Sequence, residues 1–181
     1  MLQIDLITIF DGLIKNYINL DLDKNSTKEE IIEKESRYFS MLGRLLGVDV
    51  THRGIRSSEG EVVIKWSLNE RDKIIDLEIN REEDLLNDLS SIHKLINEAK
   101  NNQNRSYIKI IETSSINRIN YLNNIVCSNN IKNNILIIYI IKDILNNKSY
   151  YNAYLFKDRA IVREKKAMIK LTKDYKLKGL I

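Results

Sequence analysis

Proline is absent from this chain of 181 residues, and it contains only one cysteine. The lone cysteine, Cys127, excludes an intramolecular disulfide and a cysteine-based zinc site. It lies in an apolar stretch, so we expect a small buried side chain rather than a nucleophile. Because Ile, Asn and Lys are abundant, we attribute the lack of proline to an AT-rich genome and infer no chemistry from it.

Glycine and histidine are also too few and too scattered for two common kinds of site. Gly43, Gly47 and Gly54 are not spaced as a phosphate-binding loop requires. The two histidines are far apart in the sequence, and their positions predict no Ser-His-Asp arrangement. His93 lies beside the apolar stripe of an expected helix, so we expect a partly buried structural histidine.

Long apolar runs that would cross a membrane are missing as well. The first twenty residues carry Asp5 and Asp11 and lack a basic start, so they do not resemble a signal peptide. The run Ile135–Ile141 is far shorter than the roughly 20 residues that span a bilayer, and it predicts a strand buried on both faces. With the lone cysteine, these features lead us to expect a cytoplasmic protein without membrane contact.

Composition predicts one globular domain over residues 1–181, with 43% hydrophobic and 30% charged residues. The net charge of +4 is unevenly distributed, because residues 156–181 hold nine basic and three acidic side chains. A basic end on a near-neutral body is typical of contact with a polyanion, although a solvated lysine-rich end has the same composition. The candidate nucleic-acid-binding residues are Lys157, Arg159, Arg163, Lys165 and Lys166.

Hydrophobic periodicity and turn signals predict alternating helices and strands. A capping box formed by Thr27 and Glu30 begins one helix, which Gly47 ends. Helices are expected at 2–20, 27–46, 82–100 and 115–126; strands at 48–51, 61–68, 73–80, 107–112 and 135–141; and a hairpin at 150–170 with its turn near 157–159. A polar loop bounded by glycines is expected at 54–60. This pattern predicts an α+β fold with an N-terminal helix (1–20), a core (27–112) and a β-rich basic extension (135–181).

Acidic residues are concentrated on the strand expected at 73–80. Because strand side chains alternate between faces, Asp76, Glu78 and Asn80 share one face. Glu61 opens the preceding strand and, in a hairpin, is expected near the end of the partner strand where Glu78 and Asn80 fall. A hydrated surface face would give the same alternation, so the pattern alone does not identify a site.

Glu35 lies inside the apolar stripe of the helix expected at 27–46 rather than opposite it. A carboxylate on a buried face is costly unless it is paired or binds something. Glu35 is therefore a candidate functional acid, and a residue that flanks the core or pairs with Arg37 or Lys34 is the alternative.

The order helix-strand-strand-strand-helix-strand over residues 27–112 resembles the common core of the PD-(D/E)xK nuclease superfamily, which includes many restriction enzymes and Holliday-junction resolvases. The resemblance implies a restriction-endonuclease-like αβββαβ core that binds Mg²⁺ or Mn²⁺. It implies Glu61, Asp76 and Glu78 as metal ligands. The carbonyl of Ile79 would complete the shell, and Glu35 would be the assisting helix acid.

Two departures from the superfamily pattern concern the catalytic groups. Asn80 stands where the superfamily has a lysine, and Gly60-Glu61 replaces its Pro-Asp. Asparagine cannot supply the positive charge that stabilises the transition state of phosphodiester hydrolysis. Lys65, on the same strand face as Glu61, is the candidate relocated lysine.

These observations predict a metal-dependent nuclease that hydrolyses phosphodiester bonds in DNA. One alternative is a catalytically degenerate nuclease fold that only binds nucleic acid. Another is a protein-protein interaction module, such as an inhibitor or immunity protein. By analogy with the superfamily, a homodimer is a further expected partner state.

Overall fold

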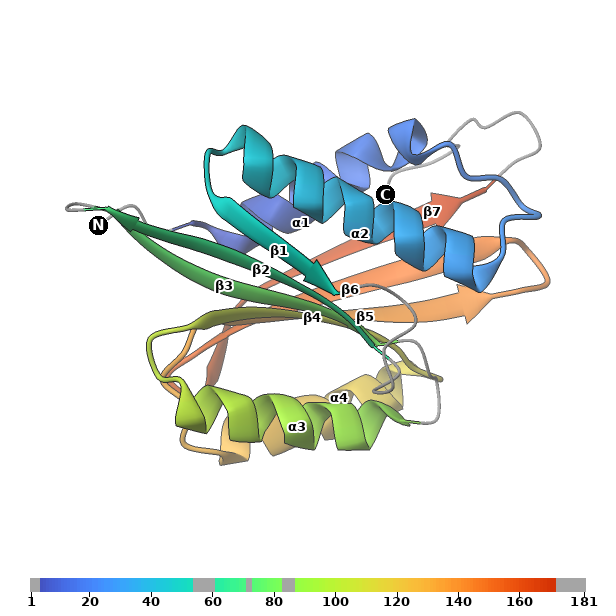
Figure 1. Ribbon diagram of the computed structural model, residues 1–181. Coiled ribbons are helices and arrows are strands. Elements are labelled where there is room, and N and C mark those ends of the chain that lie inside the picture. Colours follow the sequence, from blue (N-terminus) through green and yellow to red (C-terminus); the bar gives the residue numbers. More distant parts are fainter. Residues whose placement is uncertain (1–3, 54–60, 71–72, 83–86, 172–181) are drawn as a thin grey trace.

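Helices cover both faces of one seven-stranded mixed sheet in the computed structural model, which describes residues 4–53, 61–70, 73–82 and 87–171 (Figure 1). The helices are α1 (Leu6–Asn16), the 3₁₀ helix η1 (Tyr17–Leu20), α2 (Lys28–Leu45), α3 (Asp88–Asn101) and α4 (Ile116–Ser128). The strands are β1 (Asp49–Arg53), β2 (Glu61–Glu70), β3 (Lys73–Glu82), β4 (Ser106–Glu112), β5 (Ile135–Asp143), β6 (Lys148–Lys157) and β7 (Ala160–Lys170). The α+β class predicted from the sequence is confirmed.

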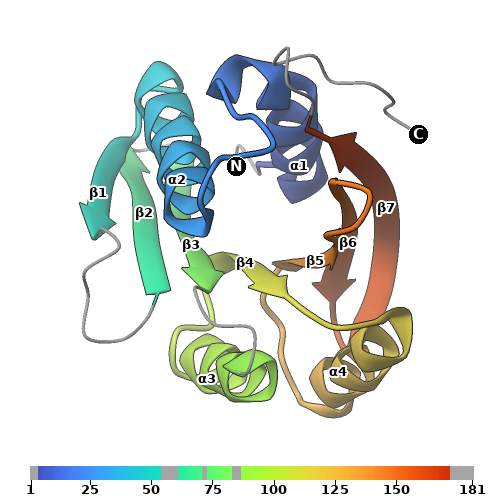
Figure 2. The same ribbon diagram turned by 90° about the vertical axis from the view of Figure 1, so that its right-hand side faces the viewer.

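The strands lie side by side in the order in which they occur along the chain. β1, β2 and β3 form an antiparallel meander, and so do β5, β6 and β7, whereas the β3–β4 and β4–β5 pairs are parallel. The two parallel pairs are connected through α3 and α4, which cover one face of the sheet, while α1 and α2 cover the other (Figure 2).

Local sequence signals account for several of these boundaries. Thr27 and Glu30 form the expected reciprocal capping box at the start of α2. Gly47 follows the end of α2 at φ 74°, a left-handed conformation that glycine adopts without steric cost. The β6–β7 hairpin turns at Asp158 and Arg159, both with positive φ, as the tight turn of a right-twisted hairpin requires.

Several sequence-based expectations need correction. The helix expected at 2–20 is, in the described residues, a shorter α1 followed by a 3₁₀ turn. The helix expected to begin at residue 82 begins at Asp88, and Glu82 is the last residue of β3. His93 is exposed rather than partly buried, since it lies outside the apolar stripe of α3, and Cys127 is only half-buried. The polar loop expected at 54–60 lies outside the described residues. No helix in the described part of the chain is both long and apolar enough to cross a membrane.

A buried ionic network lies between the sheet and the α1/α2 layer. The Arg81 guanidinium donates from Nε to Glu35 at 3.0 Å and from a terminal nitrogen to Glu112 at 3.2 Å. The hydroxyls of Tyr17 and Tyr151 each donate to the same Glu35 oxygen at 3.1 Å. The network therefore connects η1, α2, β3, β4 and β6, and Glu35 is the buried, paired carboxylate that its helix position indicated.

Electrostatics within the network favour the ionised guanidinium. Burial alone would lower the pKa of Arg81, but the carboxylates of Glu35 and Glu112 outweigh burial and raise that pKa. Burial, followed by the charge of Glu35, raises the pKa of both Tyr17 and Tyr151, so the two phenols remain neutral donors. Removing the guanidinium would leave Glu35 buried without a cation, whereas Glu112 would keep its ion pair with Lys142 of β5 at 2.8 Å.

We expect Arg81→Met to destabilise the fold by about 3–5 kcal/mol, the cost of leaving the buried carboxylate of Glu35 without its cation. The free energy of unfolding from urea denaturation measures this loss. The matched control is Arg37→Met, which breaks an exposed pair with Glu33 on one helix and should cost about 0.3–0.5 kcal/mol. Similar small losses in both variants would show that the network contributes no specific stability.

Candidate functional site

The acidic residues of β3 face α3, on the side of the sheet opposite the Arg81 network. Asp76, Glu78 and Asn80 share this face, as the strand alternation predicted. Across the hairpin, the residue pairs on this face are Glu61–Glu82, Val63–Asn80, Lys65–Glu78 and Ser67–Asp76. Glu61 therefore lies opposite Glu82. The residue opposite Glu78 is Lys65, four positions further along β2.

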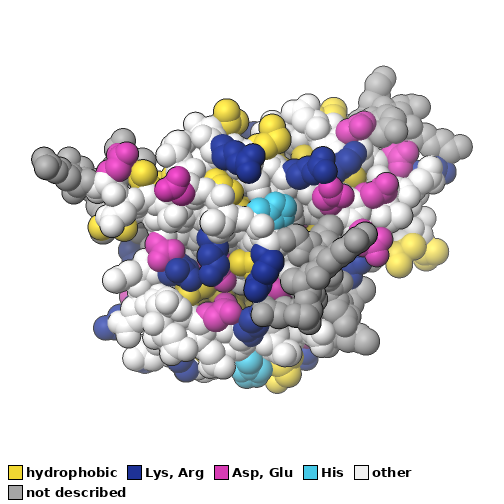
Figure 3. Space-filling model, in the orientation of Figure 1, with side chains coloured by type: hydrophobic (Ala, Val, Ile, Leu, Met, Phe, Trp, Pro, Cys, Tyr) yellow, Lys and Arg dark blue, Asp and Glu magenta, His cyan; other side chains and the backbone are white. Residues whose placement is uncertain are grey.

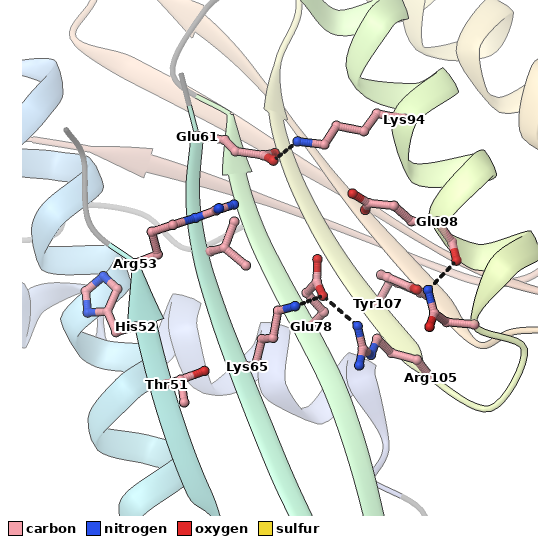
Figure 4. A pocket seen from close by; sticks show the side chains of 12 residues that line it. Thr51, His52, Arg53, Glu61, Lys65, Glu78, Lys94, Glu98, Arg105 and Tyr107 are labelled. Atoms are coloured by element: carbon pink, nitrogen blue, oxygen red, sulfur yellow. Dashed lines mark hydrogen bonds and ion pairs between the residues drawn. The ribbon is translucent and has the colours of Figure 1, made fainter. Parts of the chain in front are cut away.

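Glu78 is at the centre of one group of charges. Lys65 Nζ lies 3.0 Å from Glu78 Oε2, and the Arg105 guanidinium donates to the same oxygen at 2.9 Å (Figure 4). The Asn80 amide donates to the other Glu78 oxygen at 3.3 Å, and Arg105 also binds Asp76 at 2.7 Å. Lys65 thus reaches Glu78, but two cations, Lys65 of β2 and Arg105 before β4, already share one carboxylate oxygen.

Glu61 is at the centre of a second group. Its Oε2 lies 2.7 Å from Nζ of Lys109, a lysine of β4 with 1% of its side chain exposed, and its Oε1 accepts a hydrogen bond from Lys94 of α3. Lys109 also lies 3.8 Å from Glu82. Burial raises the pKa of Glu61, but Lys109 and then Lys94 outweigh burial and bring that pKa below its usual value.

An open cavity of about 650 Å³ joins the two groups. Figure 3 shows basic side chains gathered around a hollow near the centre of this face, and Figure 4 shows Arg53 extending from β1 into the same space. The charged side chains that line the cavity are four cations and three carboxylates: Arg53, Lys65, Lys94, Arg105, Glu61, Glu78 and Glu98. The cations come from β1, β2, α3 and the residue before β4, so their convergence is a product of the tertiary fold.

Glu98 is the third carboxylate of the cavity, and it has fewer hydrogen-bond and ion-pair partners than Glu61 and Glu78 among the described residues. Its Oε2 is buried and has no hydrogen-bond partner among the described residues. Burial, then the charge of Glu78, raises the pKa of Glu98 above its usual value. Even with all three carboxylates ionised, the lining of the cavity holds one more cation than carboxylate.

The remaining predicted site residues do not gather at this cavity. Glu35 lies on the opposite face of the sheet, in the Arg81 network. Ile79 packs its side chain into the core on that same opposite face, in the middle of a strand that pairs on both sides.

The five basic residues predicted from the C-terminal region belong to the β6–β7 hairpin, away from the cavity. Arg163 forms an ion pair with Asp5 at 2.8 Å, and Lys165 with Asp11, so both lie against α1. Arg159 donates to Asn130. Lys157 and Lys166 are exposed. These side chains do not form one uninterrupted basic face.

The arrangement of carboxylates does not fit a divalent ion. Glu61 and Glu78 are separated by four residues in register, on the order of 13 Å along the strands. Val63 and Asn80 lie between them and supply no carboxylate, and both acids are already engaged by lysine or arginine. In the described part of the chain, no three His, Cys, Asp or Glu side chains are grouped so as to hold a metal ion.

Sequence reasoning missed three cations that line the cavity, Arg53, Lys94 and Arg105, and also the buried Lys109 beside Glu61. Lys109 offered one usable signal, because it interrupts the apolar strand Tyr107–Glu112 at a position where a charge must be paired. The others resemble ordinary solvated residues in the sequence. These side chains meet at one cavity because β3 and β4 pair in parallel and α3 packs beside them.

Comparison with known proteins gives no family assignment. No family model matches the chain, and no curated protein matches it. Among solved structures, the chain is similar to the central domain of yeast acetyl-CoA carboxylase, at 10% sequence identity and a TM-score of 0.36. That match covers 84% of this chain and 27% of that chain, and a similarity of this strength supports no argument about fold or function.

Glu61 should give the protein part of its resistance to acid. Because its folded pKa is depressed, its stabilising contribution is complete above the unfolded pKa near 4.5 and is lost as pH falls through the folded pKa. We expect Glu61→Gln to be clearly less stable than the wild type at pH 7, with the difference shrinking below pH 4.5 as Glu61 becomes protonated.

Urea denaturation across this pH range measures the effect. Glu33→Gln is the control, because it removes an exposed carboxylate of α2 that pairs with Arg37 on the same helix. A Glu61→Gln difference that stays constant or grows with acidity would contradict the proposed pairing with Lys109 and Lys94.

Proposed function

We propose that this protein binds DNA through the charged cavity without cleaving it, on a core that resembles the PD-(D/E)xK nuclease superfamily. The observation that carries the proposal is the convergence of Arg53, Lys65, Lys94 and Arg105 on one cavity. Phosphate groups are the ligands that clusters of lysine and arginine bind best, because each contact adds charge attraction and releases counterions.

Accessibility of the cations supports the proposal. The side chains of Lys65 and Lys94 are 48% and 40% exposed, so a ligand in the cavity could contact their ammonium groups directly. Lys109, by contrast, is buried beneath them and holds Glu61 in place. The cavity thus has a buried layer that fixes the geometry and an accessible layer that can bind phosphate.

The nuclease-like core is supported by the arrangement of elements. Helix α2, strands β1 to β3, helix α3 and strand β4 follow one another in the expected order, and the four strands are neighbours in the sheet. Lys65 also reaches Glu78, as a relocated catalytic lysine would. The carboxylates nevertheless do not form a metal-binding set, and for that reason we favour binding over hydrolysis.

A protein-protein module is the third class, and nothing in the cavity favours it specifically. An acidic protein surface could also approach the exposed lysines. It would not need cations recessed into a cavity, because contacts between protein surfaces are broad and mostly solvent-accessible at their rim. The recessed arrangement is therefore better suited to a phosphate than to a protein surface.

Fluorescence anisotropy with short labelled DNA strands tests the proposal. Wild-type binding should weaken linearly with the logarithm of salt concentration, and Lys65→Gln should weaken binding and reduce that slope by about one. The matched control is Lys34→Gln, which removes a partly exposed lysine that pairs with Asp21 away from the cavity. Equal effects of the two substitutions would reject the cavity as the binding site.

Cleavage is tested in parallel by incubating plasmid with the pure protein and Mn²⁺. We expect no cleavage by the wild type. Cleavage that disappears in Glu78→Ala would instead support the metal-dependent nuclease and overturn the proposal. If the protein neither binds nor cleaves DNA, the result would favour the protein-partner class.

A further inference from the structure

The position of Glu78 beneath the cavity suggests which phosphate the site accepts. Lys65 belongs to β2 and Arg105 directly precedes β4, yet both contact one oxygen, Glu78 Oε2, at 3.0 and 2.9 Å. The carboxylate thus occupies the point at which two cations are best placed to bind an anion. A ligand that binds there must compete with Glu78 for the same two groups, or share them.

An internal phosphodiester is poorly equipped for that competition. It carries a single negative charge, as the Glu78 carboxylate does, and its two ester oxygens continue into the chain. A terminal phosphate monoester carries close to two negative charges at neutral pH and presents three acceptor oxygens. It can therefore attract the cations more strongly than the carboxylate does and contact more of them at once.

The shape of the cavity is better suited to the end of a DNA strand than to the middle of a continuous one. The cavity of about 650 Å³ lies within the range of pockets that enclose one small molecule. Its lining comes from β1 and β2 on one side and from α3 and the start of β4 on the other. Figure 4 shows Arg53 and Lys65 pointing inward from the first side and Lys94 and Arg105 from the second.

We propose that the cavity binds the phosphorylated end of a DNA strand, with Lys65 and Arg105 exchanging their contact with Glu78 for the terminal phosphate. This inference rests on the proposed function, because it names the part of the nucleic acid that the same site binds. It assigns Glu78 the role of an internal counter-ion that keeps the two cations together until the phosphate enters.

Strands of identical sequence that differ only at one end give the direct test. One pair carries a 3′ label and either a 5′-phosphate or a 5′-hydroxyl, and a second pair carries a 5′ label and either a 3′-phosphate or a 3′-hydroxyl. In one of the two pairs, we expect the phosphorylated strand to bind at least about tenfold more tightly, the effect of one additional charge-assisted hydrogen bond. Inorganic phosphate should compete with that strand.

Two variants identify the groups responsible. Lys65→Gln should reduce the preference for the phosphorylated end, whereas Lys34→Gln should keep it. Glu78→Gln should bind the phosphorylated strand more tightly than the wild type does, because the competing charge is gone. If Glu78 were instead a metal ligand for DNA binding, Glu78→Gln would bind the phosphorylated strand more weakly than the wild type does. Circular dichroism confirms that each variant is folded, and Lys65→Gln remains informative if Glu78→Gln fails to fold.

The outcomes separate the two proposals. If every strand binds with equal affinity and Lys65→Gln still weakens binding, the terminal-phosphate inference fails and the proposed DNA binding stands. If no strand binds, DNA binding itself is wrong. A preference for the phosphorylated end that survives in Lys65→Gln, or weaker binding by a folded Glu78→Gln, overturns the role assigned to this pair.

Discussion

The central constraint on this fold is that β3 carries ionisable side chains on both of its faces while it lies inside the sheet. Arg81 points toward the α1/α2 layer, and Glu78 and Glu82 point toward α3, all with less than 10% of the residue exposed. Charges in such positions are tolerated only when each has an opposite charge or a hydrogen-bond partner. The packing of the neighbouring elements follows from this requirement.

The two faces meet the requirement in different ways. On the α1/α2 side, one guanidinium is enclosed by two carboxylates and two phenols, and the result is a closed network that ties five elements together. On the α3 side, lysines and arginines from several elements surround Glu61 and Glu78, and the group opens into a cavity. The first arrangement is structural because Arg81 and Lys142 match the charges of Glu35 and Glu112, and the guanidinium and both carboxylates are buried. The second leaves accessible positive charge.

Much of the fold could be predicted from the sequence because its signals are local. The capping box at Thr27, the stop at Gly47 and the alternation along β3 depend on residues within a few positions of one another, and each is found as expected. The site depends on distant pairings. Whether Glu61 lies opposite Glu78 or Glu82 is set by the exact turn of the hairpin, and a hydrophobic pattern does not determine that register to within two or four residues.

Glu35 illustrates the same distinction within one residue. Its place in an apolar stripe correctly indicated a buried carboxylate that needs a partner, because that inference uses only the helical repeat. The partner could not be predicted, since Arg81 lies 46 positions away and reaches Glu35 only through the packing of α2 on the sheet. Periodicity predicted the burial of the charge but not the side of the sheet on which it would be neutralised.

Clustered acids in a sequence therefore have two opposite explanations, and the surrounding cations distinguish them. Carboxylates that bind a metal must present several oxygens to one point with little competition from lysine or arginine. In this protein, each of the two acids accepts contacts from at least two basic side chains, and the cations outnumber the carboxylates around the cavity. Four like charges held in one small space would repel one another unless acids lay between them. Glu61 and Glu78 are best understood as the counter-ions that make a phosphate-binding cluster of cations stable in the absence of its ligand.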